Sequence, residues 1–296
     1  MYKISLGIPT YEAGDGLMAT LQSIYAQTFI EHISEIIVIV DGATLTDDYK
    51  KRITHPKLKL IENADRKGPA ARVNTMLQIF TGDIFVYTND DVLLAPDAVE
   101  QIVSVFERTK ADLITGNPQP YSKKSLFHQA LAVGQQINYK VANTWNHGNN
   151  YLNCNGRLVA FSNRFGKSMK IPETLKNYDA YFYICSYIYG FSFAHASQSV
   201  VYYQLPLTLS DHLKQSAKFQ VSIVDNALFI DENLTALYQI PKNLLLSKTI
   251  EVMTQNPFAF ICYLGIFALS RLIKKELPHK NQTGYWETDK STKTII

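Results

Sequence analysis

The sequence predicts an α/β fold in which a mostly parallel sheet is covered by helices on both faces. Through the first 117 residues, short apolar segments rich in β-branched residues alternate with longer segments of helical periodicity. This alternation is typical of parallel sheets. Polar or acidic residues follow three of the apolar segments, at the strand ends where such sheets bind ligands. The 296 residues, 46% of them hydrophobic, suffice for one large domain with additions.

The elements of this first part each have a local reason. Residues 35–40 (Glu-Ile-Ile-Val-Ile-Val) are almost all β-branched, as in a strand buried on both faces. Pro69 stands where proline is tolerated, in the first turn of a helix. We predict strands over residues 4–8, 35–40, 58–61, 84–87 and 113–114, and helices over residues 14–29, 69–80 and 96–106.

The second part alternates less regularly. Gly190 ends a predicted aromatic-rich helix, and Thr208 with Asp211 resembles a capping box that opens another. We predict strands over residues 157–161 and 200–203, and helices from residue 125 towards 151, then over residues 179–189, 208–224, 233–253 and 257–275.

The net charge argues against one class of protein, and the cysteines and the first residues indicate a cellular compartment. The net charge of +3 gives no support for nucleic-acid binding, which usually requires a strongly basic face. The cysteines (Cys154, Cys185 and Cys262) are odd in number, lack metal-ligand spacing and are expected to be buried free thiols in a reducing compartment. Because Met1 leads directly into an apolar strand without a secretory signal, we expect the protein to face the cytoplasm.

Asn89-Asp90-Asp91 forms the first candidate site, at the end of an apolar strand. Adjacent carboxylates repel each other unless a positive group is present, and a divalent cation bound to a diphosphate meets that need. The alternative is an exposed acidic turn, or a capping pair for the helix that begins at Pro96.

Two further segments offer groups that bind a nucleotide. Asp41 follows a strand and can accept a hydrogen bond from a base N–H, although Asp before Gly42 also commonly forms a turn. Residues 66–74 gather cations and donors at a helix N-terminus, which favours anions; the alternative is a solvated basic helix start.

Asp179 is the candidate base. It lies among tyrosines, and a carboxylate in aromatic surroundings can have the raised pKa that suits a general base. Asp179 can equally cap the helix that follows it.

On these motifs the chain resembles the inverting family-2 glycosyltransferases with a GT-A fold. The resemblance covers about residues 3 to 220 and rests on the order and spacing of several motifs. These are the opening at residues 7–12, the strand and acidic turn at 37–44, the Gly-to-Asn segment at 68–74, the DxD-like Asn89-Asp90-Asp91, the segment Asp179 to Gly190, and residues 206–219, which are similar to a Q-x-x-R-W segment.

The resemblance implies a GT-A type, Rossmann-like sheet and a role for each matching residue. The nucleobase of the donor, expected to be uracil, would contact Thr10, Tyr11, Glu12 and Asp41. The donor pocket would also include Lys67 and Asn74. Ribose and phosphate would contact Asn89 and Asp90, while Asp91 would bind Mg²⁺ or Mn²⁺. Asp179 would deprotonate the acceptor hydroxyl, with Gln215 and Lys218 near the diphosphate or the acceptor channel.

The chain departs from the family pattern at several positions. Asn89 stands at the first DxD position, Tyr178 stands before the base where the family has Glu, and Lys218-Phe219 replaces Arg-Trp. Lys218 keeps the charge but loses the bidentate guanidinium. Together these changes leave sugar transfer as the expectation and argue against processive polymer synthesis.

We therefore predict a catalytic domain over residues 1–230, with a nucleotide-sugar half (1–117) and an acceptor half (118–230). Residues 231–276 are predicted C-terminal helices and 277–296 a polar tail. The predicted activity is metal-assisted, inverting transfer from a UDP-sugar to a cell-envelope or lipid-linked glycan. The alternatives are a non-catalytic protein of this fold that binds a glycan or a partner, and a nucleotidyltransferase, for which residues 10–16 lack a basic loop.

The segment Pro257 to Ser270 raises the question of a membrane. Its fourteen residues carry no charge, but about 21 Å of helix is shorter than the roughly 30 Å hydrocarbon core. With Arg271 directly after it, a helix lying on the inner leaflet is expected, with Tyr285 and Trp286 as interfacial anchors. This makes the protein peripheral or monotopic on the cytoplasmic face; a contact in a homo-oligomer or packing on the domain is the alternative.

Overall fold

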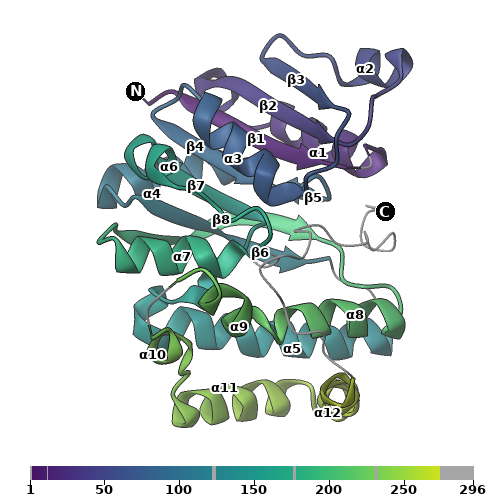
Figure 1. Ribbon diagram of the computed structural model, residues 1–296. Coiled ribbons are helices and arrows are strands. Elements are labelled where there is room, and N and C mark those ends of the chain that lie inside the picture. Colours follow the sequence, from purple (N-terminus) through teal and green to yellow (C-terminus); the bar gives the residue numbers. More distant parts are fainter. Residues whose placement is uncertain (1, 12, 122–124, 176–177, 231–232, 274–296) are drawn as a thin grey trace.

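The apolar segments form one eight-stranded sheet in the order β3-β2-β1-β4-β7-β6-β8-β5. The computed structural model describes residues 2–11, 13–121, 125–175, 178–230 and 233–273 (Figure 1). The strands are β1 (Ile4–Thr10), β2 (Ile33–Asp41), β3 (Leu58–Asn63), β4 (Ile84–Thr88), β5 (Val92–Leu94), β6 (Leu113–Pro120), β7 (Leu158–Ser162) and β8 (Phe193–Tyr203).

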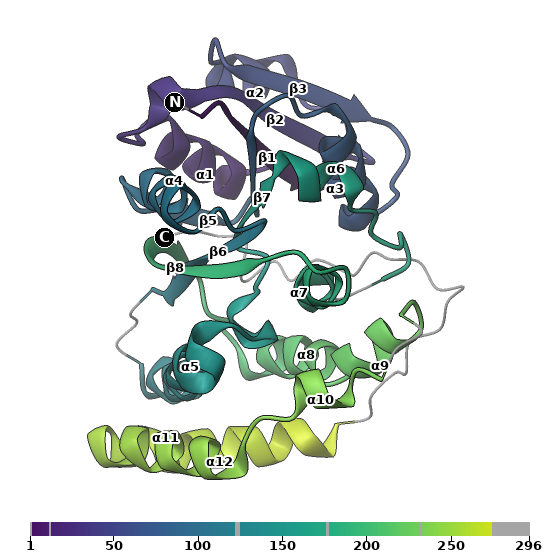
Figure 2. The same cartoon turned by 90° about the vertical axis from the view of Figure 1, so that its left-hand side faces the viewer.

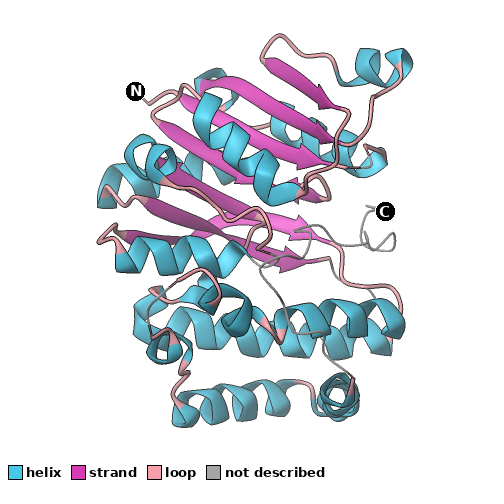
Figure 3. Ribbon diagram, viewed as in Figure 1, coloured by secondary structure: helices cyan, strands magenta, loops and turns pink. Residues whose placement is uncertain are grey.

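Most strand pairs are parallel, which confirms the predicted fold class. Strands β3, β2, β1 and β4 run parallel to one another, and β6 runs parallel to β8. The antiparallel pairs are β7 with both β4 and β6, and β5 with β8. The arrowheads of the parallel strands consequently point to one edge of the sheet (Figure 3).

Helices cover both faces of this sheet, as the sequence predicts. Helices α1 and α4 lie on one face, and α3, α6 and α7 lie on the other (Figures 1 and 2). The helices are α1 (Asp15–Tyr25), α2 (Asp47–Ile53), α3 (Pro69–Ile79), α4 (Ala98–Thr109), α5 (Leu126–Thr144), α6 (Asn163–Ser168), α7 (Tyr178–Ile188), α8 (Leu209–Phe219), α9 (Ser222–Ala227), α10 (Thr235–Tyr238), α11 (Lys242–Gln255) and α12 (Pro257–Leu272), with 3₁₀ turns at Ile30–His32, Trp145–Gly148 and Tyr151–Asn153.

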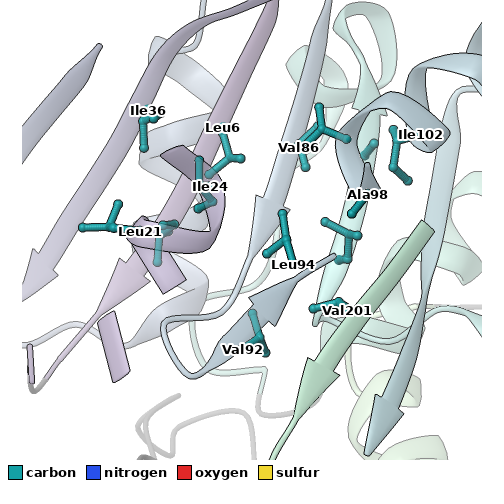
Figure 4. Packing of buried hydrophobic residues seen from close by; sticks show 14 of the residues in the cluster. Leu6, Leu21, Ile24, Ile36, Val86, Val92, Leu94, Ala98, Ile102 and Val201 are labelled. Carbon is teal, nitrogen blue, oxygen red and sulfur yellow. The ribbon is translucent and has the colours of Figure 1, made fainter. Parts of the chain in front are cut away.

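Side chains of a strand alternate between two cores, because successive residues point to opposite faces. In β2, Ile36 and Val38 join the core beneath α1 and α4, while Ile37 joins the core beneath α3 and α7. Figure 4 shows Leu6 and Ile36 of the first core beside Ile24 of α1. A strand buried on both faces has no side that faces solvent, which explains why the centre of β2 is a run of β-branched residues.

The C-terminal helices form an outer layer below α5 (Figures 1 and 2). Ile137 and Val141 of α5 are buried against Val252 of α11 and Phe260 of α12. Helix α11 therefore packs on α5, and helix α12 packs on α5 and α8. Within the described ranges, every helix is too short or too polar to cross a bilayer.

Several sequence predictions need correction in detail. The helix predicted over residues 208–224 is two helices, α8 and α9, and the helix predicted over 233–253 is interrupted before α11, where Pro241 stands at its N-cap. Strand β8 starts seven residues earlier than predicted, because its first half is too polar to read as a strand. Cys154 and Cys185 are buried free thiols as expected, but Cys262 is partly exposed.

Candidate functional site

The predicted nucleotide-binding residues gather at the edge of the sheet where the parallel strands end. Strands β1 and β4 lie side by side, with Gly7 opposite Tyr87, so Thr10 approaches the residues that follow β4. The Thr10 hydroxyl donates a hydrogen bond of 2.6 Å to Oδ2 of Asp90, and both side chains are buried. Two motifs eighty residues apart are thus one structural unit.

Asp41, at the end of β2, organises the start of α3. Its carboxylate accepts hydrogen bonds of 2.8 Å from the backbone N–H groups of Lys67 and Gly68, and it pairs with Arg72 Nε at 2.6 Å. Gly68 has a φ of +91°, where residues with a side chain are strained. The carboxylate that the sequence assigns to the nucleobase therefore also fixes the loop that carries Lys67.

Other predicted donor-site residues have different surroundings. The Tyr11 ring is covered by the Arg66 guanidinium, whose central carbon lies 3.7 Å from the ring centroid, and the Lys67 side chain is exposed. The Asn74 amide donates to Ile171 O at 2.7 Å and accepts from Ile171 N at 2.8 Å, so it anchors the segment before α7. Glu12 lies outside the described residues.

A pair of tyrosines connects the strand-end cluster, which consists of Thr10 and Asn89-Asp90-Asp91, to the candidate base, Asp179. The hydroxyl oxygens of Tyr87 and Tyr178 are 2.8 Å apart, and Tyr87 donates to Oδ1 of Asn89 at 3.0 Å. Because Tyr87 has one proton and gives it to Asn89, Tyr178 must be the donor to Tyr87. The chain of hydrogen bonds runs from α7 to the DxD-like motif.

The pKa values of these two tyrosines indicate that the carboxylates of Asp90 and Asp179 lie near them. Burial raises the pKa of Tyr87 well above its ordinary value, and the Tyr178 hydroxyl and the charges of Asp179 and Asp90 raise it further. Burial and the same two carboxylates also raise the pKa of Tyr178. Asp90 and Asp179 therefore flank one buried, protonated tyrosine pair.

Asp179 lies in the first turn of α7, which begins at Tyr178. Its carboxyl group rests against the backbone of Gly156, where an added Cβ would be 2.9 Å from the Asp179 Cγ. Burial raises the pKa of the nearby Cys154 thiol well above its ordinary value, and the charge of Asp179 raises it further. The carboxylate thus lies between the glycine turn and the tyrosine pair.

Sequence reasoning missed Tyr87 and Gly156. Tyr87 precedes Asn89 by two residues inside an apolar strand, and Gly156 precedes strand β7 in an ordinary Asn-Gly turn. For Tyr87 the sequence offered one signal, which is a hydroxyl group on an apolar strand that leads directly into the acidic residues Asp90 and Asp91. Their approach to Asp179 depends on tertiary packing.

The predicted channel residues lie on α8, which packs against α12. Gln215 is half-buried. The Lys218 side chain lies outside what the structure describes.

A divalent metal would find one partly exposed carboxylate, Asp91, at this edge. In the described part of the chain, no three His, Cys, Asp or Glu residues form a ready-made metal cluster. Mg²⁺ is commonly held by one or two carboxylates together with substrate phosphates, so this donor set fits a metal that arrives with a diphosphate.

Comparison with known proteins identifies the family of the chain. The model described as glycosyl transferase family 2 matches residues 5–165, more than half of the chain. The chain is 24% identical to UDP-Glc:alpha-D-GlcNAc-diphosphoundecaprenol beta-1,3-glucosyltransferase WfgD of Escherichia coli over 47% of this chain and 54% of that protein. It is 23% identical to hyaluronan synthase of Streptococcus pyogenes serotype M1 over 94% of this chain and 74% of the synthase. It therefore spans about half of the length of WfgD.

Solved structures share the fold. Mannosyltransferase PcManGT from Pyrobaculum calidifontis, in complex with GDP-Man and Mn²⁺, matches 93% of this chain and 76% of its own at 19% identity, with a TM-score of 0.62. TarS of S. aureus in complex with UDP-GlcNAc matches 90% of this chain and 81% of its own at 16% identity, with a TM-score of 0.52.

Proposed function

Because the chain belongs to glycosyl transferase family 2, we propose that it moves a sugar from a nucleoside-diphosphate sugar to an acceptor hydroxyl with inversion. The observation that carries the proposal is the hydrogen-bonded chain from Tyr178 through Tyr87 to Asn89, because it connects the residue before the proposed base to the first residue of the proposed phosphate site. A UDP-sugar is the proposed donor, and the names of WfgD and of the TarS complex support it.

Asp179 is the proposed base. Its carboxylate would take the proton of the acceptor hydroxyl as that oxygen attacks the anomeric carbon, on the face opposite the departing nucleotide. A general base of this kind contributes about 10²–10⁴-fold to the rate. No covalent intermediate is required, because one displacement inverts the configuration.

The strand-end cluster is the proposed site for the leaving group. Asp91 would hold Mg²⁺ or Mn²⁺ together with the diphosphate, and the metal would neutralise the negative charge that develops there. Asn89 and Asp90 would contact ribose and phosphate. Thr10, Tyr11, Glu12, Asp41, Lys67 and Asn74 complete the proposed donor site, with Asp41 and Asn74 acting partly through the loops that they hold.

We further propose that residues 1–230 are the catalytic domain and that α11 and α12 lie on the cytoplasmic leaflet of a membrane. Large apolar side chains of α12, among them Phe258 and Ile261, are exposed. Their burial in the lipid interface, with Arg271 at the headgroups, would favour this peripheral location. A lipid-linked or cell-envelope glycan is the acceptor that such a location suits.

Donor binding and turnover by three proteins test the function. Purified wild type, Asp91→Ala and Asp179→Asn are incubated with UDP-, GDP- and dTDP-sugars, with and without Mn²⁺, and nucleotide release and calorimetric binding are measured. We expect metal-dependent release from one donor class, loss of metal-dependent binding in Asp91→Ala, and retained binding with 10²–10⁴-fold slower turnover in Asp179→Asn. Glu107→Gln, an exposed carboxylate on α4, is the matched control.

The proposal fails if wild type neither binds nor cleaves any of the sugars, or if Asp179→Asn turns over at the wild-type rate.

A further inference from the structure

A cavity of about 460 Å³ lies between α5, the ends of β6 and β8, and the beginning of α12. Asn155 and Arg157 line the cavity, and Gly156 between them carries the backbone against which the Asp179 carboxyl rests. Asp179 itself does not line the cavity. The turn at residues 155–157 therefore contacts both the cavity and the candidate base.

The wall of this cavity combines apolar side chains with many amides and is almost without charge. Asparagine and glutamine side chains make up much of it, including Gln119, Gln136 and Asn138. Among its described lining residues, Arg157 is the single Asp, Glu, Lys or Arg, and its guanidinium stacks on Tyr203 at 3.8 Å from the ring centroid. Amides donate and accept hydrogen bonds without net charge, as the hydroxyl groups of sugars do.

Two buried polar atoms in the wall have no protein partner among the described residues. They are the hydroxyl oxygen of Tyr121 and Nε2 of His195. Burial lowers the pKa of His195 to about 4, so its ring is neutral at pH 7. A buried polar atom without a partner is costly unless a ligand or water satisfies it. Both atoms can thus form hydrogen bonds with the hydroxyl groups of a ligand, and neither carries a charge that would attract an ion.

A second cavity lies beside the first along α5. It has a volume of about 490 Å³, shares Tyr139 and His195 with the first and extends to Thr144 and His147. From Gln129 to Thr144, helix α5 rises about 22 Å. This length accommodates a chain of several sugar rings rather than one monosaccharide. In the second cavity Glu251 pairs with Lys140 and Lys248, so the charges there are largely matched.

We propose that the cavity between α5 and the sheet binds an uncharged oligosaccharide, whose end residue is presented to Asp179 as the acceptor. Its assignment as the acceptor rests on the glycosyl transfer proposed above, whereas binding of the oligosaccharide does not. Tyr121 and His195 would hydrogen-bond the sugar hydroxyls, and Tyr139 would pack against a ring where the two cavities meet.

Direct binding to the full chain tests the proposal without any donor sugar. Calorimetry is carried out with cellohexaose, maltohexaose and chitohexaose as neutral probes, and with hexagalacturonate as a charged one. We expect at least one neutral probe to bind, more tightly than its disaccharide, and more tightly than hexagalacturonate.

Tyr121→Phe is the sharpest variant, because it deletes one oxygen that bonds to no described residue of the free protein. Its thermal stability should equal that of wild type, while affinity for the neutral probe falls about three- to tenfold. Tyr139→Ala, at a partly exposed position, should weaken the hexamer and leave the disaccharide unchanged. Tyr189→Ala, an exposed tyrosine just beyond α7, is the matched control and should change neither affinity.

The proposal is overturned if no neutral probe binds, if hexagalacturonate binds best, or if both variants bind like wild type. Metal-dependent release of nucleotide is measured on the same preparations. If oligosaccharide binds but no donor sugar is cleaved, the cavity stands as a glycan site and the transferase activity fails. If the donor is cleaved but no oligosaccharide binds, only the cavity proposal fails.

Discussion

The hydroxyl oxygens of Tyr87 and Tyr178 lie 2.8 Å apart in a buried contact between β4 and α7. Tyr87 stands two residues before Asn89, and Tyr178 stands directly before Asp179. One hydrogen bond therefore connects two segments that are separated by ninety-one residues and carry opposite halves of the proposed chemistry. A shift of α7 relative to the sheet would break it.

Removal of this hydrogen bond should affect activity more than folding. Tyr178→Phe leaves the Tyr87 oxygen without its donor, at a cost of about 1–2 kcal/mol in the free energy of unfolding. Turnover should fall by roughly tenfold or more, because Asp179 is no longer held in register with the strand-end cluster. Urea denaturation measures the free energy of unfolding, and steady-state kinetics measure the turnover. Tyr187→Phe, exposed on the same helix, should be neutral; equal losses in the two variants would contradict the prediction.

Gly156 should tolerate no side chain. In Gly156→Ala the new methyl group would collide with the Asp179 carboxyl and displace it. Because a misplacement of about 1 Å can cost about 10²-fold in rate, kcat should fall by that order while the KM for the donor and the melting temperature change little. Gly265→Ala, in α12 with open space around it, serves as the control. An unchanged kcat in Gly156→Ala would argue against Asp179 as the base.

Breaking the buried Asp41–Arg72 ion pair by removing one partner should strongly destabilise the fold. Both side chains are 6% exposed, and Asp41→Ala would leave a buried guanidinium without its counter-charge. We expect a loss of about 3–5 kcal/mol in the free energy of unfolding, measured by urea denaturation. Glu107→Ala, at an exposed position of α4, should lie within about 0.5 kcal/mol of wild type. A small effect at Asp41 would mean that water reaches Arg72.

Glu35 should give the protein a specific sensitivity to acid. Burial opposes ionisation of Glu35, but hydrogen bonds from Lys59, Ser5 and Thr81 outweigh it and lower its pKa from 4.5 to about 2. A carboxyl group with a depressed pKa stabilises the fold above its unfolded pKa, and this contribution is lost as pH falls from about 4.5 towards 2.

Urea unfolding of wild type and Glu35→Gln between pH 2 and pH 7 measures this contribution. The variant should be less stable at pH 7, and its stability should fall less steeply below pH 4.5. Glu107→Gln should keep the wild-type slope. Parallel curves for wild type and Glu35→Gln would show that Glu35 does not titrate as expected.

The exposed apolar side chains of α12 should carry membrane binding. Phe258 and Ile261 are 81% and 66% exposed, and burial of each in lipid is worth about 1.5–3 kcal/mol. Phe258→Asp with Ile261→Asp should therefore reduce co-sedimentation with anionic vesicles by tenfold or more. The solution mass by light scattering should not change. Tyr189→Asp is the control, and a lower mass in the double variant would instead identify α12 as a contact between copies of the chain.

The local sequence determined the sheet and most of its covering helices. Residues 36–40 and 84–87 are apolar throughout, so they require burial on both faces whatever their neighbours are. Pro69 and Thr208 mark helix starts through local geometry alone, and both act at the predicted positions. By contrast β5, α2 and α6 are three to seven residues long, too short for periodicity to reveal them.

The tertiary structure decided which polar residues meet. The sequence identified Thr10, Asp41, Asn89-Asp90-Asp91 and Asp179 as candidates, since each ends a strand or begins a helix. Their partners depend on strand order, which brings β7 between β4 and β6 and so places Gly156 against Asp179. Contacts such as Thr10 with Asp90 and Tyr87 with Tyr178 join residues eighty or more positions apart, and no local preference encodes such a distance.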